Sequence, residues 1–199
     1  MAKNKKESYI RRSLKDSLRF IYDSWRYIKI IIYIFIVTFI IGLFLPAPAF
    51  LLDILREIIN NLLAKTQNLD TIGLIKYIFI NNLSVSVLSI LFGILFGVIP
   101  IILTLTNGYF IGFVSQVSIS QNGIFSLWRL LPHGVFELPA VIISLGIGLN
   151  LGASLLNPGS RGFTKKLVLA FKTLILVILP LLAIAALIEG MLISLSLSN

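Results

Sequence analysis

The only histidine of the chain, His133, stands four residues before Glu137 in an otherwise apolar stretch, LWRLLPHGVFELPAVII. Residues four apart lie on one face of a helix, so these two side chains can meet. An ionised carboxylate at the centre of a bilayer costs about 3 kcal/mol even on insertion scales. Glu137 is therefore expected to face the protein interior, to be neutralised, or to lie near a membrane surface. Three interpretations remain open: a hydrogen-bonded latch between helices, half of a metal site, or a path for protons or ions.

A latch needs polar partners from other apolar segments, and Asn107, Gln116 and Glu189 are the candidates. We predict a functional polar core of His133, Glu137, Asn107 and Gln116.

The metal interpretation would use His133 and Glu137, which at this spacing can both reach one zinc ion. Zinc is the only cofactor considered, and the chain has no cysteine to form a thiolate site. Catalysis is not expected, because one histidine cannot supply the HExxH motif and no nucleophile elbow or nucleotide fingerprint is present. An intramembrane metal or hydrolase site is the alternative.

Two prolines frame the His/Glu pair. Pro132 suits the first turn of a helix, where its missing N–H costs nothing. Pro139 removes a hydrogen bond to the carbonyl of Val135, so the helix is expected to bend beside the pair.

The composition predicts an integral membrane protein built from helices. Of 199 residues, 57% are hydrophobic and only 13% are charged, and the apolar runs are long and lack the alternation of a β-barrel. The formal net charge of +9 does not indicate nucleic-acid binding, because the basic residues flank apolar spans. We expect an all-α polytopic fold of five transmembrane helices plus amphipathic interfacial helices.

The first 29 residues are predicted to form a cytoplasmic basic arm with an amphipathic helix that binds anionic lipid. Residues 30–199 form the five-span domain, with an external amphipathic segment at 50–75 and Asp70 as the N-cap of the next helix. Asn107-Gly108 is expected to break the chain between the second and third spans, and Pro180 to kink the last. The expected spans are 30–45, 83–106, 108–120, 131–156 and 167–198.

Charge counting determines the orientation. The first thirty residues carry nine Lys and Arg, which places the N-terminus in the cytoplasm. If residues 108–120 cross the membrane, the basic loop with Arg161, Lys165 and Lys166 also returns to the cytoplasm. We therefore predict a multipass plasma-membrane protein with its N-terminus inside and its C-terminus outside.

Small residues four apart let membrane helices approach closely. Such pairs predict a compact bundle, either through contacts within the chain or with a face left for a second copy. The pairs are Gly93/Gly97, Gly108/Gly112 and Gly148/Gly152.

The segment NGYFIGF at 107–113, followed by LPHGVFELPAVIISLGIGLNLG at 131–152, resembles the stage II sporulation protein M family over roughly residues 20–195. The resemblance implies a five-span plasma-membrane protein without established enzymatic activity. The family's named member is a scaffold that positions two peptidoglycan-degrading enzymes at the septum. The matching motif positions are Asn107, Gly108, Gly112, Pro132, His133, Gly134 and Glu137.

The function we expect is a membrane scaffold or assembly protein that recruits partner proteins and self-associates as a homodimer. The alternative is a small transporter or channel component with a polar His/Glu site in the membrane. A water-accessible cavity at membrane depth would favour the alternative, whereas hydrogen bonds that close the His/Glu pair would favour the scaffold.

Overall fold

The computed structural model describes the chain except for residues 1, 46, 131–132, 157–161 and 198–199, and it leaves undescribed the side chains of residues 2–8, 50, 128–130, 133 and 194–197. Every element in the described part is helical, which confirms the predicted all-α class. Five helices are long and apolar enough to cross a membrane, as predicted. They are Trp25–Phe44, Thr71–Phe92, Val98–Asn122, Gly134–Leu155 and Phe163–Ile193.

The elements follow one another without long loops. In chain order they are α1 (Ala2–Asp23), α2 (Trp25–Phe44), α3 (Ala49–Thr66), α4 (Thr71–Phe92), α5 (Val98–Asn122), the 3-10 helix η1 (Ile124–Leu130), the π-helix η2 (His133–Glu137), α6 (Leu138–Leu155), α7 (Phe163–Thr173), the π-helix η3 (Leu174–Ile178) and α8 (Leu179–Leu197).

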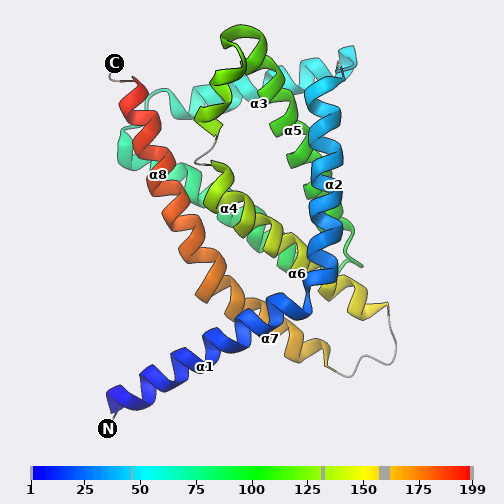
Figure 1. The fold of residues 1–199 in the computed structure, drawn as a ribbon, viewed down its shortest axis with the longest axis vertical. Coiled ribbons are helices and arrows are strands. Elements are labelled where there is room, and N and C mark those ends of the chain that lie inside the picture. The colour runs from blue at the N-terminus through cyan, green and yellow to red at the C-terminus, as the bar shows by residue number, and fades with distance from the viewer. Residues whose placement is uncertain (1, 46, 131–132, 157–161, 198–199) are drawn as a thin grey trace.

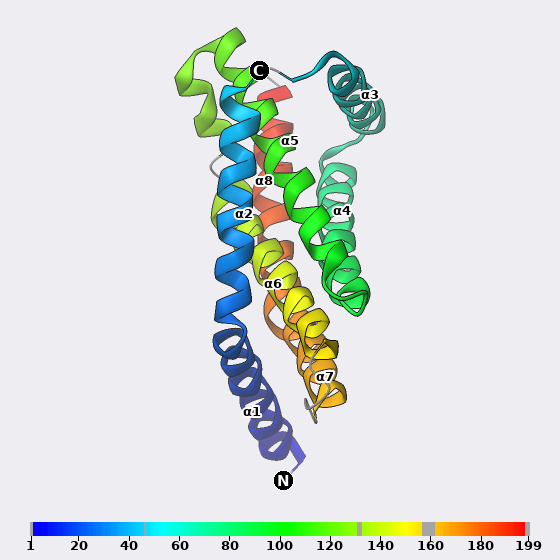
Figure 2. The same ribbon diagram turned by 90° about the vertical axis from the view of Figure 1, so that its right-hand side faces the viewer.

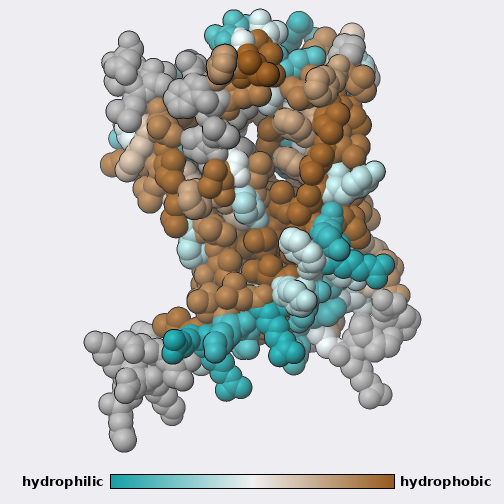
Figure 3. Space-filling model, in the orientation of Figure 1, coloured by the Kyte–Doolittle hydropathy of each residue, from teal (hydrophilic) through white to brown (hydrophobic). Residues whose placement is uncertain are grey.

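Helices lie across both ends of the bundle of spans (Figures 1 and 2). Helices α1 and α7 pack together below the spans, α3 lies across the top, and the two chain ends lie at opposite ends of the molecule. Figure 3 shows an apolar band around the spans with hydrophilic side chains gathered along α1 below. This distribution is that of a helical membrane protein with amphipathic helices at its surfaces.

Helix α1 presents different faces to α7 and to the surroundings. Ser13 and Ser17 are buried, and small side chains of this kind allow α1 and α7 to pack closely. The apolar stripe predicted for this helix is largely uncovered, since Ile10, Leu14 and Leu18 are exposed. The exposed basic residues between these faces are Arg11, Arg12, Lys15 and Arg19.

The predicted span 83–106 and the predicted break at Asn107-Gly108 are wrong. The chain breaks earlier, between α4 and α5, where Phe96 and Gly97 adopt left-handed backbone angles (φ 53° and 76°). Asn107 and Gly108 lie inside α5, where the Asn107 amide donates to the Leu103 carbonyl oxygen at 2.7 Å. Residues 108–120 are therefore the second half of α5 and not a separate span. Five spans still result, because α4 begins earlier than predicted, at Thr71. The residue before it, Asp70, is the predicted N-cap, and its carboxylate accepts a hydrogen bond from the Gly73 amide at 2.9 Å.

Glycines bring α4 and α6 into backbone contact. A Cβ at Gly93 would lie 2.8 Å from Gly148 Cα, and one at Gly152 would lie 2.6 Å from Gly97 Cα. The two predicted small-residue pairs of these helices thus face each other within one chain. Ser89 adds a hydrogen bond across the same contact, from its Oγ to the Ser144 carbonyl oxygen at 3.1 Å.

The remaining glycine pair lies against α2. A Cβ at Gly112 would overlap the Phe39 carbonyl oxygen and come within 3.0 Å of the Leu43 amide nitrogen, and a Cβ at Gly108 would lie 2.9 Å from the Phe35 carbonyl oxygen. Gly42 of α2 makes the reciprocal approach, 3.0 Å from the Phe113 amide nitrogen. Helices α2 and α5 therefore touch through their backbones along most of their length.

A buried polar network joins the lower ends of the helices. Asn150 Nδ2 donates to Ser24 Oγ at 2.9 Å, at the junction of α1 and α2. Lys166 Nζ, at the start of α7, donates to Asn150 Oδ1 at 3.1 Å and to Ser154 Oγ at 2.6 Å. One lysine thereby connects the layer of α1 and α7 to the end of α6.

The Gly112→Ala substitution is expected to lower the free energy of unfolding by about 1–3 kcal/mol, because backbone atoms of α2 cannot yield to the added methyl group. Gly134→Ala is the matched control, since an added Cβ there meets nothing within 4 Å. Thermal unfolding of both purified variants, followed by the fluorescence of the two tryptophans, measures the difference. Equal melting temperatures for the two variants would contradict this account of the α2–α5 contact.

Candidate functional site

A cavity of about 260 Å³ lies among the spans at the level of η2. Its lining comes from α2, α4, α5, η2, α6 and α8, and from Leu62 of α3. The polar members are Tyr77, Asn81, Asn82, Asn107, Glu137 and Glu189. A concave site with apolar walls and a few convergent polar groups is the usual form of a small-molecule site.

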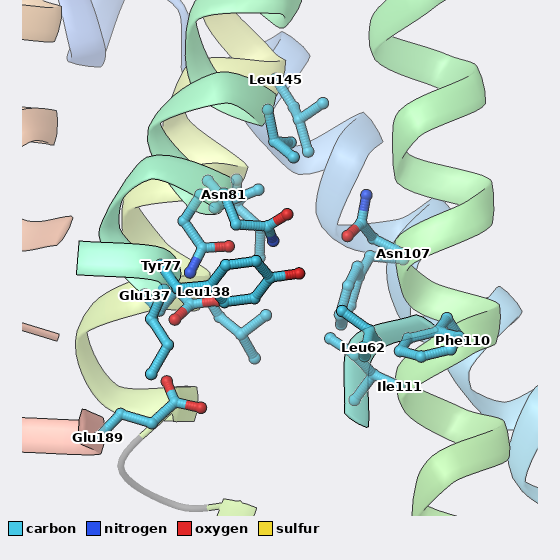
Figure 4. A pocket seen from close by; sticks show the side chains of 16 residues that line it. Leu62, Tyr77, Asn81, Asn107, Phe110, Ile111, Glu137, Leu138, Leu145 and Glu189 are labelled. Atoms are coloured by element: carbon cyan, nitrogen blue, oxygen red, sulfur yellow. The ribbon is translucent and has the colours of Figure 1, made fainter. Parts of the chain in front are cut away.

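The polar groups are distributed over opposite walls of the cavity (Figure 4). Glu137 and Glu189 lie at one side, Asn107 stands with Phe110 on α5 at the other, and Asn81 projects between them from α4. In the space-filling view the molecule is hollowed in its upper half, beside α2 (Figure 3). The site thus gathers two carboxyl groups at one side of a mainly apolar chamber.

The local helix geometry places Glu137 at the cavity. Glu137 is the last residue of the π-helix η2, whose wider turn reaches back five residues, and only 3% of its surface is exposed. Pro139 follows in the first turn of α6, where it needs no hydrogen-bond acceptor. At the expected bend the structure has a π-turn, and the helix continues through it from Gly134 to Leu155. Of the three positions considered for Glu137, the burial of its side chain fits the protein interior.

Of the four residues predicted for the polar core, two come together in the cavity. Asn107 and Glu137 both line it, whereas Gln116, two turns further along α5, is not among its lining residues. The side chain of His133 and the whole of Pro132 lie outside the described residues. A Cβ added at Gly134 would meet nothing within 4 Å, while Gly108, Gly112, Gly148 and Gly152 form the helix contacts described above.

Sequence reasoning missed most of the polar lining. Tyr77 and Asn81 are four residues apart and Asn82 follows directly, so this spacing indicates a polar face on α4. A predicted span that begins at Leu83 leaves this polar face out. Glu189 was named only as a candidate partner of Glu137, and its place beside the cavity depends on how α8 packs against η2.

Among the described residues, no group of three His, Asp or Glu side chains lies close enough together to hold a metal ion. Because the His133 side chain is not described, zinc at His133 and Glu137 stays a prediction. Carboxylates accept hydrogen bonds, amides both donate and accept, and the tyrosine hydroxyl does both. The cavity is therefore equipped to hold a small polar or cationic molecule within the membrane.

The sequence model of the stage II sporulation protein M family matches residues 31–192, so the chain belongs to this family, as its motifs predicted. The match includes every residue that lines the cavity. No curated protein and no solved structure matches the chain.

Water is expected to reach the cavity, and cysteine labelling tests this without background because the chain contains no cysteine. Single Asn81→Cys and Asn107→Cys variants should react with a charged, membrane-impermeant thiol reagent, because only a hydrated thiol ionises to the reactive thiolate. Leu88→Cys is the control: this side chain is 40% exposed on the same helix as Asn81 but does not line the cavity. Protection of both cavity cysteines would show that the chamber is closed to water.

Proposed function

We propose that this member of the stage II sporulation protein M family admits a small polar solute into the cavity among its spans, as a small transporter or channel component. The observation that carries the proposal is the cavity itself, which combines Glu137, Glu189 and three asparagines among helices that are long and apolar enough to cross a membrane. Polar and ionisable side chains are costly there and are characteristically found along solute or ion pathways. The proposal involves no catalysis.

The orientation we propose follows from charge. The basic arm of residues 1–29 and the basic α7 lie at the same end of the molecule, which the positive-inside rule places in the cytoplasm. The C-terminus is then external, and α3 lies at the outer surface of the plasma membrane. The exposed apolar stripe of α1, flanked by arginines, suits an anionic lipid surface.

At least one class of small solute is expected to raise the melting temperature of the purified protein, because a ligand that binds only the folded state stabilises it. The panel comprises amino acids, alkylamines, alcohols, sugars and inorganic cations. The double variant Asn81→Leu/Asn107→Leu should lose this stabilisation, since it removes hydrogen-bonding groups from two walls of the cavity. The same solute should enter proteoliposomes that contain the unaltered protein faster than liposomes without protein.

Asn61→Leu is the matched control, because Asn61 is exposed on α3 and does not line the cavity. Stabilisation retained in the double variant would place the binding elsewhere. If no solute of the panel stabilises the protein and none crosses the proteoliposome membrane, the transport proposal fails.

A membrane scaffold is the second candidate, and α3 is the observation that favours it. This helix contacts the spans only sparsely and leaves Ile54, Ile58 and Leu63 exposed beside its charged residues. An amphipathic helix that buries Leu55 and brings Leu62 to the cavity, but leaves these three apolar side chains exposed, offers a surface for a partner protein or for a second copy of the chain.

If two copies associate through α3, a single Ile58→Cys variant should form a disulfide-linked homodimer in membranes under mild oxidation. Ile72→Cys serves as the control, because Ile72 is 73% exposed at the start of α4, away from this surface. Electrophoresis without reducing agent gives the measurement. Equal cross-linking at both positions would indicate random collision and would remove the support for a dimer at α3.

A further inference from the structure

We infer that the ligand of the cavity is a small organic ammonium compound whose amino group binds between Glu137 and Glu189. The inference rests on the proposed function and adds to it the chemical class of the solute. It depends on the charge, the size and the wall chemistry of the cavity.

Charge favours a cation. Two carboxyl groups face one chamber, and the described lining residues include no Lys or Arg. Glu137 is buried and Glu189 is half-buried, and one carboxylate oxygen of each, Oε2, is buried. Two neighbouring carboxylates repel each other, and the repulsion is stronger where water is scarce than at a surface. A positive charge between Glu137 and Glu189 relieves this repulsion, whereas an anionic ligand would add to it.

The volume of the cavity and the side chains that line it favour an organic cation over a metal ion. The volume of about 260 Å³ is several times the roughly 30 Å³ that one water molecule takes up in the liquid. A bare metal ion needs a close shell of oxygen ligands. Away from the glutamates the walls consist largely of aliphatic side chains, which suit an alkyl group better than the water shell of a metal ion. These residues are Val85, Ile111, Leu138, Val141, Ile142 and Leu145.

The polar groups match the donors of a primary ammonium group. Such a group has three N–H donors, and carboxylate oxygens together with the side-chain oxygen of Asn81 can accept them. Tyr77 and Phe110 add aromatic rings to the walls, and aromatic faces attract cations. The amino group therefore lies at the glutamate side, and the alkyl chain extends toward α5.

The test is equilibrium binding of radiolabelled n-butylamine to the full chain in lipid nanodiscs. Saturable binding should be displaced by unlabelled n-propylamine and not by n-butanol, butyrate or sodium chloride at the same concentration. Glu189→Gln should weaken the affinity by about tenfold or more, since it removes a charge-assisted contact with little change in shape. Glu57→Gln, the same change at an exposed position of α3, should leave the affinity unaltered.

A second variant covers the case in which the glutamine substitution disturbs folding. Val85→Phe keeps both carboxyl groups and fills part of the chamber, so it should also abolish butylamine binding. Both variants are compared with the unaltered protein by size-exclusion profile and melting temperature, and only variants that match are used for binding.

The outcomes separate this inference from the function on which it rests. Binding of butanol as tight as that of butylamine, or butylamine binding unchanged in Glu189→Gln, would overturn the ammonium assignment and leave a polar-solute cavity. Displacement of butylamine by sodium ions at equal concentration would assign the site to metal cations instead. If no butylamine binds while another solute of the panel does, the ammonium inference alone fails. If nothing of the panel binds, both fail.

Discussion

The structure depends on contact between helix backbones at glycines. Lipid chains are as apolar as leucine, so the hydrophobic effect does little to drive one membrane helix against another, and close packing must replace it. Gly108 and Gly112 place α5 against α2, while Gly93 and Gly148 place α4 against α6. These contacts fix the positions of α2, α4, α5 and α6: those between α4 and α6 close the lower half of the bundle, while those of Gly108 and Gly112 lie against the second, upper half of α2 (Figure 1).

The cavity occurs where the glycine contacts between α4 and α6 end. In its glycine-bearing half α6 is buried almost continuously from Ser144 to Gly152, but at its start the chain forms η2 and the larger side chains of Tyr77 and Asn81 face it from α4. The π-helix and proline recur together: η2 ends two residues before Pro139, and η3 ends two residues before Pro180. π-turns and prolines are recognised causes of helix bending. Each of the two spans that carry a cavity glutamate contains both features, with Glu137 within η2 and Glu189 in α8 after η3.

The sequence predicted what depends on local pattern. Composition and span length predicted five membrane helices, Asp70 was recognised as a cap from its residue type, and the cost of a carboxylate in lipid made the protein interior one of three positions considered for Glu137. The break at Gly97 was missed because Asn107-Gly108 carries an equally strong local turn signal. Only the contact with α2 explains why Gly108 lies inside a helix. Glu189 was one of three candidate partners of Glu137, and the sequence could not choose among them for the same reason, since the choice depends on how segments about fifty residues apart pack.

The charges of the chain are separated along the axis of the bundle. The basic residues of α1 and α7 lie at the end where Lys166 holds Asn150 and Ser154, whereas the acidic cavity lies in the other half. A cation entering from the side of α3 would be attracted to the cavity and then repelled by the basic layer below it. Passage through the molecule would therefore require the lower contacts to open, while binding in the cavity would not. The glycine contacts between α4 and α6 and the lysine network act together as the barrier on that side, while the π-helices η2 and η3 belong to the two spans that carry the carboxyl groups of the cavity.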